Sequence, residues 1–194
     1  MARIDNKKFY TSALNLHGAT AKGLNWHSTK HQTIRFKTIL ELLPDNLSTI
    51  SITDAGCGFG DFYIYMQKRE KLPYKYIGID SVSNSCTIAS KKISQKIMEL
   101  DICKDTLPTS DYYICSGALN ILTYFETYQF IHNCYRSSTK GFIFNTLYGD
   151  NLSKHYNYLT KNHIYKIAKS LDIKDIVFIE GYLKNDITVL FLKP

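Results

Sequence analysis

Short apolar runs alternate with amphipathic stretches along most of this chain, and each pattern predicts a different element. A short apolar run bounded by polar residues or glycine is typical of a buried strand, whereas apolar residues three and four positions apart predict a helix. The predicted strands are 50–53, 74–79, 96–100, 111–115, 141–145, 174–180 and 187–193. The predicted helices are 28–43, 61–71, 84–92, 126–137 and 160–171, with a loop over 147–159.

The order of these elements predicts the fold class. Strands that alternate with helices form a mainly parallel sheet with helices on both faces. The last two predicted strands are separated only by the turn signal at 181–186, so we expect them to pair antiparallel. The chain is therefore predicted to be an α/β protein with a seven-stranded sheet in a domain over 45–194. A segment over 1–44, which includes the first helix, precedes that domain.

The net charge of +7 comes almost entirely from the N-terminal segment. Residues 1–40 contain seven Lys and Arg residues against Asp5 alone, which is +6, so the remaining residues carry only +1. Most of these cations are Lys rather than Arg, the residue that forms forked bonds to phosphate and guanine. We therefore expect this segment to be a lid over an anionic end of a ligand rather than a general nucleic-acid surface.

Composition excludes several other classes of protein. With 44% hydrophobic and 21% charged residues, the chain can bury a core and is not disordered. It has neither an apolar run long enough for a membrane span nor an apolar signal core. Its five cysteines lack a C-x-x-C pair, as expected of a reduced cytoplasmic protein. His27 and His31 have no further ligand residue beside them, so no metal site is expected.

A glycine-rich loop after the first predicted strand carries the strongest chemical signal. Residues 54–61 read D-A-G-C-G-F-G-D, and this G-x-G-x-G spacing lets a ligand lie on the loop and on the N-terminus of the next helix. The acids on either side would repel a pyrophosphate but suit a sulfonium and an ammonium group. Asp80 ends the second strand, 24 residues after Gly56, where a carboxylate accepts ribose hydroxyls. Asp101 ends the third strand, within reach of an adenine amino group.

These motifs resemble the class I S-adenosylmethionine-dependent methyltransferases over about 45–194. The patterns H-G-A-T at 17–20, G-L-N-W at 23–26 and S-G-A-L-N at 116–120 are similar to a bacterial branch of small methyltransferases. The resemblance implies a Rossmann-like fold and S-adenosylmethionine as cofactor. It implies that the cofactor is bound by Asp54, Gly56, Cys57, Gly58, Gly60 and Asp61 at the methionine part, by Asp80 and Ser81 at the ribose, by Asp101 and Ile102 at the adenine, and by Ser116 and Gly117 near the methyl group.

Three polar residues are candidates for the catalytic step. An oxygen or nitrogen acceptor needs positioning and, in some cases, a base. His17 is the candidate whose chemistry suits a base near neutral pH, and a surface or capping histidine is the alternative. Asn120 and Asn145 are candidates for orienting the acceptor, with capping or turn roles as the alternative.

Three further residues are expected to contact ligand. Trp26, the sole tryptophan, and Tyr148 are candidates for the wall of a substrate pocket, with core packing as the alternative for Trp26. Arg35 lies on the first predicted helix, which in this fold can pass near the methionine end of the cofactor. It is expected to pair with the methionine carboxylate, with an ordinary exposed helix charge as the alternative.

The leading hypothesis is a cytoplasmic enzyme that transfers a methyl group by in-line displacement to an oxygen or nitrogen of a small molecule, acidic molecules included. A nucleic-acid methyltransferase is the alternative, favoured by the basic segment. Against it, the fourth strand ends in C-S-G-A at 115–118, rather than in the Asn/Asp-Pro-Pro-aromatic set of amino-methylating enzymes. A second alternative is a non-catalytic partner protein that binds S-adenosylmethionine, because a glycine loop indicates binding rather than catalysis.

Overall fold

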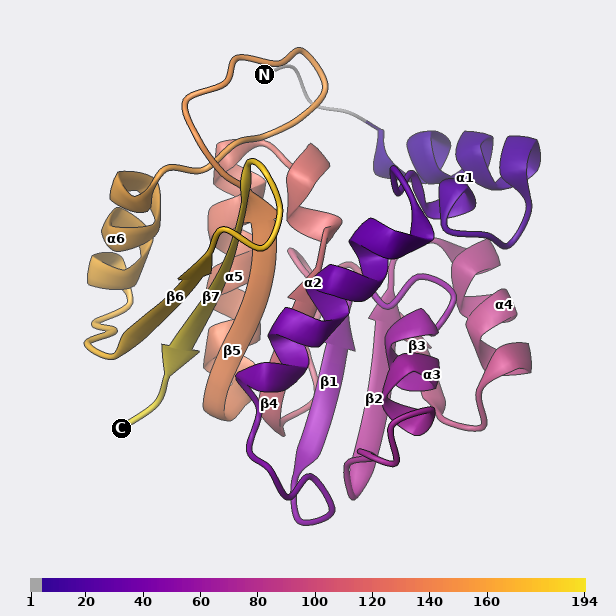
Figure 1. The fold of residues 1–194 in the computed structure, drawn as a ribbon, viewed down its shortest axis with the longest axis horizontal. Helices are drawn as coiled ribbons and strands as arrows, with labels where there is room; N and C mark the ends of the chain where they lie inside the picture. The colour runs from indigo at the N-terminus through magenta and orange to yellow at the C-terminus, as the bar shows by residue number, and fades with distance from the viewer. Residues whose placement is uncertain (1–4) are drawn as a thin grey trace.

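The computed structural model describes residues 5–194, which are built around one mixed sheet (Figure 1). The sheet has seven strands in the order β3-β2-β1-β4-β5-β7-β6. The strands are β1 (Ser51–Ala55), β2 (Lys75–Asp80), β3 (Lys96–Glu99), β4 (Ser110–Ser116), β5 (Ser138–Leu147), β6 (Ile176–Glu180) and β7 (Asp186–Leu192). The helices are α1 (Asn6–His17), α2 (Thr29–Glu41), α3 (Asp61–Gln67), α4 (Ser83–Lys92), α5 (Tyr124–Ser137) and α6 (Lys161–Ser170), with short 3₁₀ turns η1 (Lys22–Leu24) and η2 (Ala118–Ile121).

The strand pairing confirms the predicted α/β fold. β1 is parallel to β2 and β4, and the parallel pairing continues to β3 on one side and β5 on the other. β7 is antiparallel to both β5 and β6, so the chain ends in the predicted hairpin. From β1 the chain runs outward to β3 and then returns to β4 on the other side of β1. In open α/β sheets such a reversal creates a crevice at the carboxyl ends of the strands, where ligands bind.

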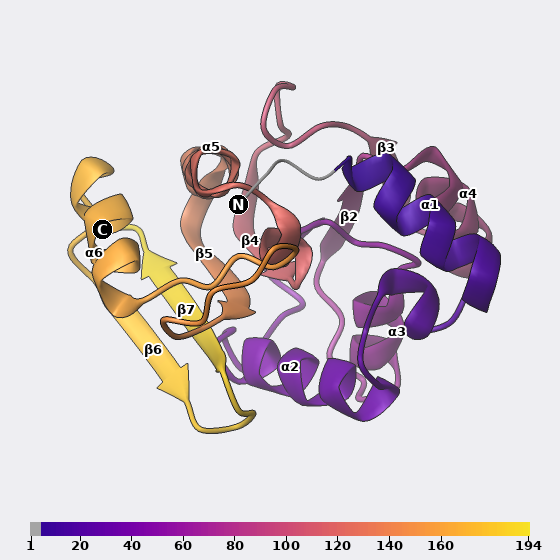
Figure 2. The same ribbon diagram turned by 90° about the horizontal axis from the view of Figure 1, so that it is seen from above.

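Helices cover both faces of the sheet (Figure 2). On one face α2 and α3 bury apolar side chains such as Met66 against Ile114 of β4. On the other face α5 and α6 bury side chains such as Ile131 against Tyr113 of the same strand. Neighbouring residues of β4 thus point to opposite clusters, as the two-residue period of a strand requires. None of the helices in residues 5–194 combines the length and apolar character needed to cross a membrane.

The N-terminal segment contains a helix that the sequence pattern does not predict. The side chain of Asp5 caps α1 by accepting a hydrogen bond from the backbone N–H of Lys8 at 3.0 Å. Among the 12 residues of α1 only Ala13 is buried, so this helix contributes little to the core. α1 lies beyond the carboxyl ends of β2 and β3, above the crevice (Figures 1 and 2).

Two elements differ most in length from those predicted. The helix predicted over 61–71 ends at Gln67, and three residues later the backbone turns left-handed at Glu70, with φ 57°. The strand predicted over 141–145 extends to the 10 residues of β5, because β5 pairs with β4 on one side and β7 on the other. Pairing with its neighbours thus makes β5 longer than the local sequence pattern predicts.

Candidate active site

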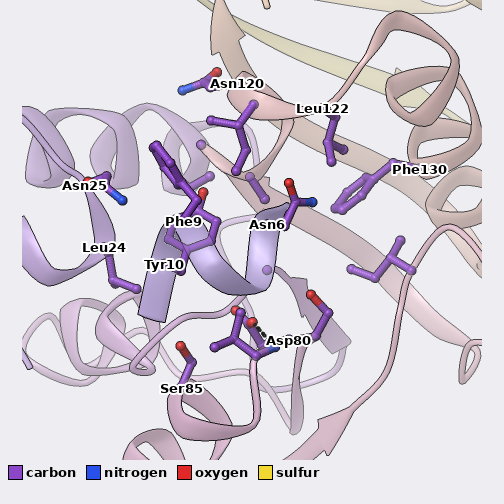
Figure 3. A pocket seen from close by; sticks show the side chains of 18 of the residues that line it. Asn6, Phe9, Tyr10, Leu24, Asn25, Asp80, Ser85, Asn120, Leu122 and Phe130 are labelled. Atoms are coloured by element: carbon purple, nitrogen blue, oxygen red, sulfur yellow. Dashed lines mark hydrogen bonds between the residues drawn. The ribbon is translucent and has the colours of Figure 1, made fainter. Parts of the chain in front are cut away.

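A pocket opens at the carboxyl ends of β1, β2 and β4, beneath α1 (Figure 3). Two groups of residues form most of its lining. The first, named here the strand-end edge, follows β1 to β4 and consists of Gly56, Asp80, Ser81, Asp101, Ile102, Ser116 and Gly117. The second, named the N-terminal wall, consists of Asn6, Phe9, Tyr10, Leu24, Asn25 and Trp26. The pocket therefore combines residues from the predicted crevice with residues from the segment that covers it.

The loop after β1 comes closest to its surroundings at Gly56. This residue has φ 81°, and a Cβ atom added to it would stand 2.6 Å from the Cβ of Ala118. The backbone N–H groups of Gly56 and Cys57 donate to the carbonyl of Ile79 at 2.8 and 2.9 Å, which ties the loop to β2. A side chain at Gly56 would strain the backbone and collide with the turn after β4.

Asp80 is held in place by two backbone donors. Its Oδ2 accepts from the N–H of Gly58 and its Oδ1 from the N–H of Val82, each at 2.9 Å. Burial raises the pKa of Asp80 above its usual value, and these backbone bonds oppose that rise. Each carboxylate oxygen has more than one acceptor site. The side chain therefore presents two oriented acceptors to the pocket, an arrangement that fits the two hydroxyls of a ribose.

Asp101 marks the neighbouring position along the edge. Its Oδ1 accepts from the backbone N–H of Cys103 at 3.0 Å, and its Oδ2 accepts from Nζ of Lys104 at 2.5 Å. Ile102 is buried beside it, and both residues line the pocket together with Phe130. An acid next to apolar side chains suits a flat heterocycle that carries an amino group.

A chain of hydrogen bonds runs from Ser116 on the pocket floor toward the C-terminal hairpin. Oγ of Ser116 donates to Oδ1 of Asn145 at 2.7 Å, and Nδ2 of Asn145 donates to Oγ1 of Thr188 at 3.1 Å. Thr188 in turn donates to the hydroxyl of Tyr182 at 2.8 Å. Asn145 is fully buried and does not line the pocket. The structure therefore places this predicted catalytic residue behind Ser116, where it orients that hydroxyl.

Arg35 lines the pocket, but a carboxylate of the protein already binds it. Its Nε and Nη2 donate to the two oxygens of Asp186 at 2.9 and 2.7 Å, and both side chains are buried. Burial raises the pKa of Asp186 to about 6 although the guanidinium opposes the rise, so the pair is ionised at neutral pH. The guanidinium also lies 4.9 Å from the ring centroid of Trp26. A Cβ added to Gly117 would stand 3.6 Å from Nη1, so this nitrogen faces the strand-end edge.

Three predicted cofactor residues lie behind the glycine loop rather than in the pocket. Asp54 is buried and accepts from the hydroxyl of Tyr76 at 2.7 Å. Its burial, opposed by that bond, raises its pKa to about 7. Cys57 is buried, and Asp61 forms a short ion pair with Lys92. These three residues are therefore part of the support of the loop and are not among the residues that line the pocket.

Gly58 and Gly60 also act from behind the loop. Both have left-handed backbones, and a Cβ atom would meet Leu24 at 2.8 Å in the first case and Ile93 at 2.9 Å in the second. Neither lines the pocket. The G-x-G-x-G spacing therefore predicted the shape of the loop correctly, while only Gly56 among its glycines reaches the pocket.

The remaining predicted residues divide between the pocket and other places. Asn120 and Trp26 line the pocket, and Oδ1 of Asn120 accepts from the backbone N–H of Leu147 at 3.1 Å. His17 is exposed at the end of α1, in a shallow depression on another side of that helix. Tyr148 lies on the loop before α6, where it packs against the core outside the pocket. The structure thus places neither His17 nor Tyr148 among the residues that line this pocket.

The sequence did not identify several residues that the structure brings to the pocket. Asn6, Phe9 and Tyr10 come from the unpredicted helix α1. Tyr156 comes from the loop between β5 and α6. Asp186 fixes Arg35 from 151 residues away, a separation over which a single sequence carries no pairing signal.

Solved structures of similar shape show that this chain has the fold of the class I S-adenosylmethionine-dependent methyltransferases. In sequence, no protein-family model and no curated protein matches the chain. The structural similarity is nevertheless extensive, and it confirms the fold that the glycine loop and strand order predict.

One similar structure is magnesium protoporphyrin IX methyltransferase from Synechocystis PCC 6803 with bound S-adenosylmethionine, at 17% identity, TM-score 0.73 and 100% coverage of both chains. Another is an S-adenosylmethionine-dependent methyltransferase from Leishmania major, at 18% identity and TM-score 0.73, covering 95% of this chain and 83% of that one. Human N-acetylserotonin methyltransferase in complex with S-adenosylmethionine is similar at 14% identity and TM-score 0.64, covering 96% of this chain and 66% of that one.

Proposed function

We propose that this protein is a methyltransferase that uses S-adenosylmethionine to methylate an oxygen or nitrogen of a small molecule. The observation that carries the proposal is Asp80, which lines the pocket at the end of β2 and whose two oxygens are fixed by backbone N–H groups. The similar structures that contain the same cofactor support the proposal through their fold.

The residues along the strand-end edge fit this cofactor in order. Asp80 suits the ribose, and Asp101 with Ile102 suits the adenine. At the other end, Nη1 of Arg35 is the guanidinium nitrogen left over by Asp186, and it suits the methionine carboxylate. The loop at Gly56 leaves no room for a Cβ, so its backbone can approach a ligand closely.

When bound, S-adenosylmethionine supplies a methyl group on a sulfonium, a good leaving group. The chain then contributes positioning and exclusion of water, which can provide much of the rate for such a displacement. Asn120 and Tyr156 line the pocket where an acceptor would enter, and α1 covers it. No histidine lines the pocket among residues 5–194, so we assign no general base to the chain.

The covering helix favours a small acceptor over a base within a polynucleotide. Asn6, Phe9 and Tyr10 reach the pocket from α1, which narrows the approach to the strand ends. A nucleic-acid substrate would need an open groove there to admit its backbone. Two of the similar structures are named for small acceptors, a magnesium porphyrin and N-acetylserotonin.

Calorimetry with S-adenosylmethionine tests this proposal. We expect the wild type to bind and Asp80→Ala to bind at least about tenfold more weakly, since it loses charge-assisted bonds worth roughly 1.5–3 kcal/mol. Asp45→Ala is the matched control, because Asp45 is fully exposed in its loop and lies outside the pocket. Absence of binding by folded wild-type protein would refute the proposal. A screen of metabolite extracts with labelled methyl groups then identifies the acceptor.

A further inference from the structure

The charges around the pocket bear on the class of acceptor. Among residues 5–194, Arg35 is the one cation that lines the pocket, and Asp186 holds it in a buried two-bond ion pair. Asp80 and Asp101 add negative charge at the strand-end edge. An anionic acceptor that enters the pocket would lose its hydration, and these residues offer it no unpaired cation in return. Its binding would therefore carry an uncompensated desolvation cost.

Aromatic side chains from three separate segments surround the same space. Phe9 and Tyr10 come from α1, Trp26 from the segment before α2, and Tyr156 from the loop before α6. The rings of Phe9 and Tyr10 meet edge to face, with centroids 5.3 Å apart at 84°. Trp26 is fixed by an edge contact to Phe36 at 6.3 Å and by the guanidinium at 4.9 Å. Such rings offer flat apolar surfaces for stacking.

Two polar side chains among these rings, Tyr10 and Asn120, are neutral, whereas Arg35 lies against Trp26 and Asp80 acts on Tyr10. The hydroxyl of Tyr10 makes no hydrogen bond within the part of the chain that the structure describes. Desolvation of this hydroxyl and the nearby charge of Asp80 raise its pKa, so it stays a phenol that can donate or accept. Oδ1 of Asn120 is taken by Leu147, which leaves its amide N–H groups for a ligand. Figure 3 shows Phe9, Tyr10, Asn25 and Asn120 around the one pocket. Neutral donors and acceptors between aromatic surfaces suit a ring with hydroxyl or amino substituents.

We propose that the methyl acceptor is a small, uncharged aromatic compound whose ring hydroxyl or amine is methylated, held between Tyr10 of α1 and the rings of Trp26 and Tyr156. This inference rests on the proposed function and names its substrate class. In the transfer, the ring oxygen or nitrogen forms a bond to the methyl carbon as the carbon–sulfur bond breaks. The sulfur keeps that electron pair, and the acceptor releases its proton to solvent.

Three two-ring probes of similar size separate the effect of aromaticity from the effect of charge. Naphthol is aromatic and neutral, its fully hydrogenated analogue decalol is neutral but not aromatic, and naphthoic acid is aromatic and anionic. Binding is measured by ligand-observed NMR and calorimetry with saturating S-adenosylhomocysteine, which keeps the probes out of the cofactor site. We expect naphthol to bind at least about tenfold more tightly than either of the others, a ratio typical of one lost stacking contact.

Variants locate the probe on the protein. Tyr10→Ala and, independently, Tyr156→Ala should each weaken naphthol binding about tenfold, whereas Tyr10→Phe should cost threefold or less because it keeps the ring. Leu16→Ala is the matched control on α1, since Leu16 is 76% exposed and lies outside the pocket. Circular dichroism confirms that each variant is folded.

Two results would overturn the inference. One is naphthoic acid or decalol binding as tightly as naphthol. The other is naphthol binding that neither Tyr10→Ala nor Tyr156→Ala changes. The failure of the proposed function is a different result, because it would appear as absent binding of S-adenosylmethionine before any probe is added.

Discussion

The strand-end edge and the N-terminal wall enclose one pocket but are built in opposite ways. Both oxygens of Asp80 are bound by backbone donors, and Gly56 packs against its neighbours without room for a methyl group. By contrast, α1 has one buried residue, and it joins η1 through a close contact between Gly18 and Gly23. The edge is thus fixed by its own hydrogen bonds and packing, whereas the α1 part of the wall has only one buried residue to hold it. In the proposed function, the strand-end edge would bind the cofactor, which many enzymes share. The N-terminal wall would bind the acceptor, which differs from one enzyme to another.

The largest expected effect comes from breaking the ion pair that joins α2 to the sheet. Arg35→Met leaves the carboxylate of Asp186 buried without its partner, which should lower the free energy of unfolding by about 3–5 kcal/mol. Urea unfolding at neutral pH measures the change. The double variant Arg35→Met/Asp186→Leu should recover most of the loss, because it removes both buried charges. A double variant as unstable as the single one would show that the cost lies in packing instead.

Alanine at two glycines compares the edge and the wall directly. Gly56→Ala meets the Cβ of Ala118 in a left-handed backbone, so it should cost about 2–3 kcal/mol and weaken cofactor binding. Gly18→Ala has nothing within 4 Å of its new methyl group, so it meets no collision. Its φ of 65° with ψ −168° is nearly restricted to glycine, so backbone strain of about 1–3 kcal/mol applies. Thermal unfolding and calorimetry measure both. Equal losses would mean that the edge is no more tightly packed than the wall.

A smaller effect is expected beneath the glycine loop, and it depends on pH. The pKa of Asp54 is about 7 in the folded protein and near 3.8 when exposed, so the folded state holds the extra proton between these values. The stability of the wild type therefore falls as pH rises from about 4 to about 7 and then levels off. Asp54→Asn should stabilise the protein by on the order of 1–2 kcal/mol at pH 8 and hardly at all at pH 4.

Melting temperatures across this pH range test that prediction, with the exposed Asp45→Asn as control. A gain for Asp54→Asn that is constant with pH would show that Asp54 stays ionised. A buried negative charge would then lie beneath the glycine loop at every pH tested, and the folded protein would carry the desolvation cost of that charge.

The difference between the two regions also explains what the sequence could predict. Strand ends followed by glycine or aspartate are local signals, so Gly56, Asp80, Asp101 and Ser116 were placed at the pocket from the sequence. Their positions follow from parallel strands that all end at one edge. The mainly parallel sheet follows from the alternation of strands and helices, and the final hairpin follows from the turn signal between the last two strands. The observed pairing confirms both.

The wall gave no comparable signal. α1 buries only Ala13, and it brings Phe9 and Tyr10 to the pocket through its position over the strand ends, which no local pattern indicates. Residue type alone also favoured His17 and Asn145, yet one is exposed and the other fully buried. Whether a polar side chain faces a pocket depends on contacts between distant segments, such as that of Arg35 with Asp186.

The hydrogen bonds that lead away from Ser116 all point in one direction. Ser116 gives its only proton to Asn145, which gives one to Thr188, which gives its own to Tyr182 in the hairpin turn. Toward the pocket, the hydroxyl of Ser116 can therefore only accept a hydrogen bond, so it favours a ligand atom that donates one. Reversing that preference would require the amide and the hydroxyls to reorient together. The floor of the site thus has a fixed polarity, set from the far end of the sheet, that an ammonium group would satisfy and a carboxylate would not.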